Sequence, residues 1–157
     1  MANKNFVNQR RNKCHKQEIM CVLKIYSDTN SFKAFSKNTE IPVYSCLDKG
    51  EVLTSKRLCE KYRISFGVSD REWDDFEGQI SDTVSFLEKY YAQIQELFAT
   101  HSITDAFLDF PLWSRLGENI VNQNDYIPRE LIKLAGELNI GICMAIYAQN
   151  AFENETS

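Results

Sequence analysis

The amino-acid sequence predicts an α+β fold, with one mainly antiparallel sheet, two principal helices packed on one face and a short third helix. Three observations support this fold class. Several segments alternate apolar and polar residues with the period of a strand. One long segment repeats apolar residues at helical spacing. The chain has 157 residues, 43% of them apolar, which is enough for one packed domain.

Charge divides the chain into a single domain over residues 18–150, a flexible basic arm over 1–17 and a frayed acidic tail over 151–157. The arm carries five basic and no acidic side chains, which leaves 13 basic and 22 acidic side chains in the remainder, a net charge of −9. An acidic body repels nucleic-acid phosphates and favours basic protein partners. The basic arm has the charge to bind an anionic surface, but its five charges are not interleaved with aromatic residues, which favours a solvated tail.

The first strand is predicted at 18–27, where apolar residues alternate. A short helix follows over 32–37, after the capping residues of 28–31. Residues 38–60 show little pattern beyond an extended step at Ile41-Pro42 and a turn at 48–50. Residues 61–69 alternate again and predict a strand with one solvated face.

The strongest helix signal begins at Ile80 and runs over about five turns. Its opposite side is polar, so one face is expected to lie on the sheet and the other in water. The buried stripe consists of Ile80, Val84, Leu87, Tyr91, Ile94 and Phe98.

Residues 104–113, TDAFLDFPLW, contain two carboxylates that resemble a catalytic pair. The segment alternates strictly and contains Pro111, so a strand is the better interpretation. In a strand the Cα atoms of Asp105 and Asp109 lie about 13 Å apart. Paired carboxyl groups in glycoside hydrolysis lie about 5 to 9.5 Å apart, so these two aspartates do not cooperate.

The C-terminal third predicts a turn over 117–125 with a short strand at Ile120–Val121. A helix then begins at Pro128 and stops at 139–141. Its buried side is expected to consist of Leu131, Leu134, Ala135 and Leu138. The last strand, 140–148, is apolar on both faces, which predicts a central position covered on both sides.

This order of elements resembles an uncharacterised bacterial family of small α+β domains of unknown function. The resemblance covers about residues 18–148. It implies a fold similar to that of immunity proteins, which neutralise bacterial toxins, and it carries no established reaction. The phrases that match are Glu40-Ile41-Pro42, Asp48-Lys49-Gly50, Tyr62-Arg63-Ile64-Ser65 with Trp73, and the stretch from Leu131 to Tyr147.

The densest polar feature is the segment 70–77, DREWDDFE. Acidic residues steer basic partners, and Trp is enriched at interface hot spots. The segment therefore predicts a partner-binding surface for a basic protein such as a toxin. The competing interpretation is structural, with acids at a helix start and inward-packed aromatics. The candidate binding residues are Asp70, Glu72, Trp73, Asp74, Asp75, Phe76 and Glu77.

A second class of function is a small-molecule-binding domain or an enzyme that uses an aromatic pocket on the sheet. Core packing explains the aromatic residues equally well. A third class is a structural subunit with no separate site. The candidate pocket residues are Tyr44, Tyr62, Trp113, Tyr126 and Tyr147.

Catalytic machinery is sparse in the sequence. The two histidines are His15 in the arm and His101 after the long helix, and no nucleotide, hydrolase or metalloprotease motif is present. We therefore expect a non-catalytic protein with no cofactor and no metal.

The five cysteines have no metal-ligand spacing, and several lie in apolar runs, as expected in a reducing compartment. Cys143 is expected to be buried in the last strand. With no signal-like apolar region and no membrane-length run, the sequence predicts a cytoplasmic protein. It gives no oligomeric state. The cysteines are Cys14, Cys21, Cys46, Cys59 and Cys143.

Overall fold

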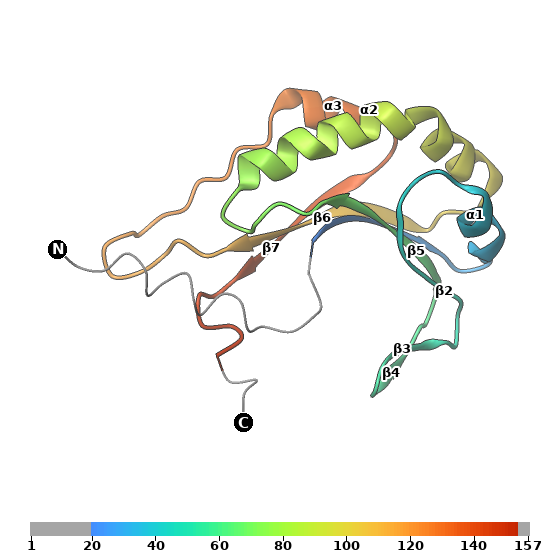
Figure 1. The fold of residues 1–157 in the computed structure, drawn as a ribbon, viewed down its shortest axis with the longest axis horizontal. Coiled ribbons are helices and arrows are strands. Elements are labelled where there is room, and N and C mark those ends of the chain that lie inside the picture. Colours follow the sequence, from blue (N-terminus) through green and yellow to red (C-terminus); the bar gives the residue numbers. More distant parts are fainter. Residues whose placement is uncertain (1–19, 154–157) are drawn as a thin grey trace.

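The computed structural model describes residues 20–153, so the predicted arm 1–17 and the last four residues of the predicted tail lie outside it. Figure 1 shows a sheet with the two longer helices on one of its faces. The elements are β1 (Cys21–Ser27), α1 (Lys33–Asn38), β2 (Val43–Leu47), β3 (Val52–Thr54), β4 (Arg57–Leu58), β5 (Tyr62–Ser69), α2 (Phe76–Thr100), β6 (Asp105–Trp113), α3 (Arg129–Glu137) and β7 (Gly141–Tyr147).

The main sheet has five strands in the order β2-β5-β1-β6-β7. The first three ladders are antiparallel and the β6–β7 ladder is parallel, so the predicted α+β class is confirmed. β1 is the central strand. Its Leu23 pairs with Phe66 of β5 on one side and with Leu108 of β6 on the other.

The core lies between the sheet and α2. Alternate residues of the three central strands point toward α2, as the period-2 pattern predicts. The most deeply buried of them include Leu23, Ile25, Phe66, Leu108 and Phe110, each with 1% or less of its surface exposed. The predicted stripe of the long helix supplies the facing layer at Ile80, Leu87 and Ile94.

The helix α2 begins four residues earlier than its apolar stripe. The carboxylate of Asp75 accepts a hydrogen bond from the Gly78 amide at 2.9 Å and caps the helix. At the other end, the His101 amide donates to the Leu97 carbonyl at 3.1 Å. Acids at the helix start therefore have a structural role, as one of the two interpretations of segment 70–77 requires.

The last strand is not central, which corrects the prediction made from its composition. β7 lies at the edge of the sheet and pairs with β6. Cys143, Met144 and Ile146 on it are exposed, whereas Cys143 was expected to be buried. Helix α3 covers the sheet through Leu131, Ala135 and Leu138, and it leaves the outer part of β7 uncovered.

Residues 38–60 contain an edge strand and a hairpin. β2 pairs with β5, and β3 with β4 forms a separate two-stranded sheet that projects below the main sheet in Figure 1. The predicted turn at 48–50 is present, with Gly50 at φ 89°. This left-handed conformation is costly for residues with a side chain, which explains the glycine.

The predicted short strand at Ile120–Val121 is wrong. Residues 114–127 run as an irregular connection, with one isolated bridge between Gly117 and Ile120. Within residues 20–153, none of the helices combines the length and the hydropathy needed to cross a lipid bilayer.

Candidate functional site

Segment 70–77 leaves the end of β5 and leads into α2, and two of its residues are structural. Phe76 is 8% exposed and packs edge-on against Phe110, with the ring centroids 5.6 Å apart. Asp75 caps α2. Both residues belong to the predicted binding surface. Phe76 is buried, whereas the Asp75 side chain keeps 44% of its surface exposed beside its capping role.

Arg71 ties this segment to the first turns of α2. Its guanidinium donates to Asp82 at 3.1 Å and to Asp75 at 3.5 Å. The hydrogen bond to Asp82, with the charges of Asp82, Asp75 and Asp70, raises the pKa of Arg71. This single base therefore neutralises part of the acidic segment and fixes its backbone relative to the helix.

Trp73 packs into an aromatic cluster at the end of β6 and β7. Its ring centroid lies 4.6 Å from Trp113, 4.7 Å from Tyr147 and 5.9 Å from Phe152. Phe152 belongs to the segment predicted as a frayed tail, and residues 151–153 form turns against this cluster. Trp73 is partly buried by these contacts, and part of its surface remains exposed.

The remaining acids of the segment are exposed on this base. They are Asp70, Glu72, Asp74 and Glu77. We call these four residues the acidic rim. The Asp75 cap, the Arg71 guanidinium and the aromatic cluster around Trp73 hold the backbone beneath these four residues.

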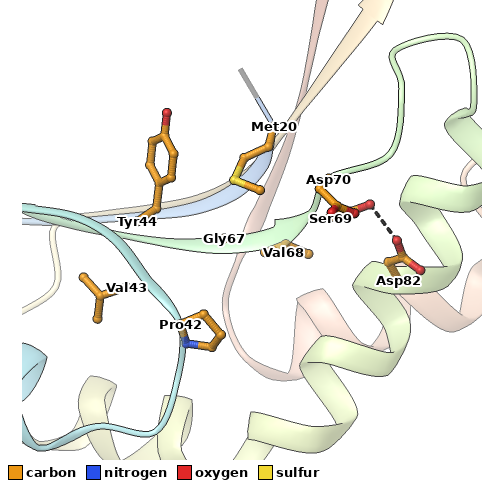
Figure 2. Close-up of a pocket in the computed structure, with 9 residues that line it drawn as sticks. All are labelled: Met20, Pro42, Val43, Tyr44, Gly67, Val68, Ser69, Asp70 and Asp82. Carbon is orange, nitrogen blue, oxygen red and sulfur yellow. Dashed lines mark hydrogen bonds between the residues drawn. The ribbon is translucent and has the colours of Figure 1, made fainter. Parts of the chain in front are cut away.

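An open pocket with a volume of about 360 Å³ adjoins this rim. It forms where β2 stops covering β5: the pairing of these strands begins at Val43 and Phe66, and β5 continues to Ser69. We call it the acidic pocket. Figure 2 shows its lining residues, which are Met20, Pro42, Val43, Tyr44, Gly67, Val68, Ser69, Asp70 and Asp82.

The acidic pocket combines apolar side chains with two carboxylates. Met20, Val43 and Val68 supply apolar surface, and Asp70 and Asp82 lie together at one end. One oxygen of Asp82 is occupied, because it accepts from the Ser69 hydroxyl at 2.7 Å and from Arg71. Asp70 is exposed, and within residues 20–153 its carboxylate has no hydrogen bond or ion pair.

The five aromatic residues proposed as a pocket do not converge. Tyr62 pairs with Ser27 at one end of the sheet, whereas Trp113 and Tyr147 are paired at the opposite end of β6 and β7. Tyr44 lines the acidic pocket, and Tyr126 is 77% exposed in the irregular connection. Only Trp113 and Tyr147 lie together, and they are packed against Trp73.

A second cavity of about 220 Å³ lies between the β3–β4 hairpin and the open face of the sheet. We call it the hairpin cavity. Arg63 lies over the Tyr26 ring at 5.9 Å, and its Nε is buried without a hydrogen-bond partner in the described part of the chain. The cavity is lined by Tyr26, Leu53, Arg57, Leu58, Cys59, Glu60, Lys61 and Arg63.

Two groups with the chemistry of a base or a nucleophile, His101 and Cys21, are held in packed surroundings. His101 stacks on Phe32 at 5.3 Å and meets the Phe35 ring at 6.2 Å, and its Nδ1 contacts the Thr100 hydroxyl. Burial raises the pKa of the Cys21 thiol to about 12. Such a thiol stays protonated at neutral pH. Within the described chain, no three His, Cys, Asp or Glu residues are grouped to hold a metal ion.

No protein-family model, no curated protein and no solved structure matches this chain.

The residues of the acidic rim were predicted from the sequence, but most residues that line the acidic pocket were not. Asp70 carried a local signal, since it belongs to a dense acidic run. Met20 precedes β1, Val43 begins β2 and Asp82 lies in α2. The pairing of β1 and β2 with β5, together with the packing of α2, brings them to one pocket. The positively charged hairpin cavity was also missed, because residues 38–60 lack a period that would place their side chains.

Proposed function

We propose that this protein is a non-catalytic binding module that engages a basic protein partner through the acidic rim and the acidic pocket. The observation that carries the proposal is the exposed carboxylate of Asp70, which lies at one end of the acidic pocket and has no hydrogen bond or ion pair within residues 20–153. Apolar surface suits the aliphatic stem of a long cationic side chain, and a carboxylate suits its charged head. The partner therefore inserts a Lys or Arg side chain here.

The charge of the whole chain supports this proposal. Outside the arm the chain carries a net charge of −9. A field of this sign speeds the encounter with a basic protein, and the rim then adds local complementarity.

Within this class we propose an immunity-type inhibitor of a toxin in the cytoplasm. The support is the resemblance given by the sequence and the sign of the charge, since a basic active cleft is complementary to an acidic plug. The cysteines Cys21, Cys46, Cys59 and Cys143 are free thiols, as a reducing compartment would keep them.

The pocket is tested by nuclear magnetic resonance with N-acetyl-lysine amide and N-acetyl-arginine amide as probes. We expect concentration-dependent shifts at Gly67, Ser69 and Asp70 that weaken in Asp70→Asn. Norleucine amide, which lacks the cation, is the control ligand, and Glu88→Gln on the exposed side of α2 is the control variant. Shifts of equal size in Asp70→Asn and the unmodified protein would contradict the proposal.

The partner is tested with the protein encoded beside this chain in its genome. Charge reversal at Asp70 and Glu72 should weaken its binding and lower the salt dependence of the affinity. Asp75 is unsuitable for this experiment, because its change also removes the cap of α2. An affinity that is insensitive to both reversals would exclude the acidic rim as the contact surface.

The hairpin cavity favours a second candidate function, the binding of a small anion. The observation is the buried Nε of Arg63, which has no hydrogen-bond partner among residues 20–153 and lies beside Arg57 and Lys61. A carboxylate or phosphate group would supply the missing acceptor. Titration with inorganic phosphate should shift the Arg63 Nε–H resonance, and Arg57→Gln should weaken the effect. An unchanged resonance at saturating phosphate would remove this candidate.

A further inference from the structure

Among residues 20–153, nothing pairs with the outer edge of β7, and the strand lacks the residues that normally protect an edge strand. The strand reads GICMAIY and contains no charged residue and no proline. Met144 is 40% and Ile146 is 53% exposed, and Cys143 is exposed on the opposite face of the sheet. Soluble proteins usually blunt such an edge with charges, prolines or a covering element, because its free backbone groups can pair with another strand.

The backbone of β7 shows which residues offer these groups. The Tyr147 carbonyl accepts from the Ser114 amide at 2.7 Å, so Tyr147 directs its backbone toward β6. In a parallel ladder, alternate residues of a strand face the same neighbour. Cys143 and Ala145 therefore also face β6, whereas Ile142, Met144 and Ile146 direct their amides and carbonyls outward.

These outward residues are complementary to themselves under a two-fold rotation. If two copies pair antiparallel about Met144, then Met144 meets Met144 of the second copy, and Ile142 meets Ile146 of the second copy. All three outward positions then form hydrogen-bonded pairs, each of which exchanges two backbone bonds. The side chains brought opposite one another are all apolar, and no charge of β7 is buried.

We propose that this protein forms a two-fold symmetric homodimer in which β7 pairs antiparallel with β7 of a second copy. The two five-stranded sheets become one continuous sheet. The pairing covers Met144 and Ile146, which α3 leaves exposed. It uses a different part of the chain from Asp70 and the acidic pocket, so it stands independently of the proposed function.

The oligomeric state in solution tests the dimer. Sedimentation velocity of the full chain should give twice the 18.2 kDa chain mass. Met144→Lys places two like charges opposite one another on the two-fold axis and should give the monomer mass. Ile132→Lys, at a residue 55% exposed on α3, is the matched control and should remain dimeric. A monomeric unmodified protein overturns the proposal and leaves the edge for a strand of another protein, and a dimeric Met144→Lys variant overturns it as well.

The register has its own test. Centred on Met144, the pairing places Ala145 opposite Cys143 of the second copy in a non-hydrogen-bonded pair, with Cα atoms about 4.5 Å apart. This separation permits a disulfide. With oxidised glutathione as oxidant, Ala145→Cys should give a covalent dimer linked through residues 143 and 145, and Ala148→Cys, beyond the strand, should give far less. Equal linkage in the two variants overturns the register.

Discussion

The indole ring of Trp73 lies 4.6 Å from that of Trp113, and the Trp73 carbonyl accepts a hydrogen bond from the Trp113 amide at 3.3 Å. The acidic segment is therefore joined to the end of β6 through both side chain and backbone. Trp73 positions the acidic rim, which separates its role from that of the exposed carboxylates beside it.

We expect Trp73→Ala to lower the free energy of unfolding by about 2 kcal/mol, because it removes contacts with three other rings from a partly buried site. Urea denaturation followed by circular dichroism measures this loss. Trp73→Phe, which keeps a ring, should lose less. The chain has two tryptophans. Exciton coupling between their indole rings should give a circular-dichroism band that disappears when either tryptophan is replaced. A Trp73→Ala protein with unchanged stability would show that the cluster is not structural.

The cap of α2 predicts that the effects of Asp75→Ala and Gly78→Ala on the free energy of unfolding are not additive. A methyl group added at Gly78 would overlap the carboxylate of Asp75, so Gly78→Ala must displace the capping carboxylate. The gain in helix propensity, about 0.5–1 kcal/mol, is then offset by the loss of the cap, which stabilises the helix by about the same free energy. We expect Gly78→Ala to be nearly neutral alone.

In the Asp75→Ala background the cap is already absent, so Gly78→Ala should stabilise by about 0.5–1 kcal/mol. A double-mutant cycle in urea measures the coupling between the two residues. Additive free energies would mean that the Asp75 carboxylate does not cap the helix in solution.

The elements with a clear period could be predicted from the sequence. Strands β1, β5 and β6 and the helix α2 each bury one face, so their apolar residues recur with the period of the element. The structure confirms the strand interpretation of Asp105 and Asp109, which lie in β6 opposite Tyr26 and Val22 of the central strand.

The position of β7 in the sheet was predicted wrongly, because two different environments of a strand give the same composition. A strand that is apolar on both faces is typical of a central position, and an apolar edge strand such as β7 has the same pattern. The acidic pocket could not be predicted for a different reason. Its lining depends on the register of β2 and on the bulge between Val43 and Ser45, which have no local sequence signal.

On the open face of the sheet, Lys24 forms an ion pair with Asp109, and both side chains are mostly buried, at 26% and 18% exposure. The second oxygen of Asp109 is buried without a partner in the described residues. We expect Lys24→Met to destabilise by about 1–3 kcal/mol, because it leaves a largely buried carboxylate without a counter-ion.

The double variant Lys24→Met with Asp109→Leu should recover much of this loss, since it removes both charges together. The control is the exposed pair of Lys61 and Asp28, at 44% and 56% exposure, where Asp28→Asn should cost less than about 1 kcal/mol. The midpoint of urea denaturation gives the stability of the unmodified protein, of Lys24→Met, of the double variant and of Asp28→Asn. Equal costs for Lys24→Met and Asp28→Asn would show that burial does not strengthen the pair on the sheet.

The turn that leads into the hairpin predicts a pH dependence. The Glu51 carboxylate accepts a hydrogen bond from the Asp48 amide and pairs with Lys33 at 2.9 Å. The backbone hydrogen bond, followed by the bond to Lys33, lowers the pKa of Glu51 below its ordinary value of 4.5. A carboxyl group whose pKa is lower in the folded state stabilises the fold above its unfolded pKa. That contribution is lost as the pH falls through the folded value.

Glu51→Gln should therefore be less stable than the unmodified protein at neutral pH, and the two should converge as the pH falls below 4.5 and through the lowered pKa. Urea denaturation across this range measures the difference, and a carbon-13 titration of Glu51 gives its pKa directly. Glu88→Gln, on the exposed side of α2, is the control and should show no such convergence. Added salt should weaken the Lys33 part of the effect and preserve the part due to the Asp48 amide, because only the first is an ion pair. A Glu51 that titrates at or above 4.5 would contradict the assignment of this turn as the cause.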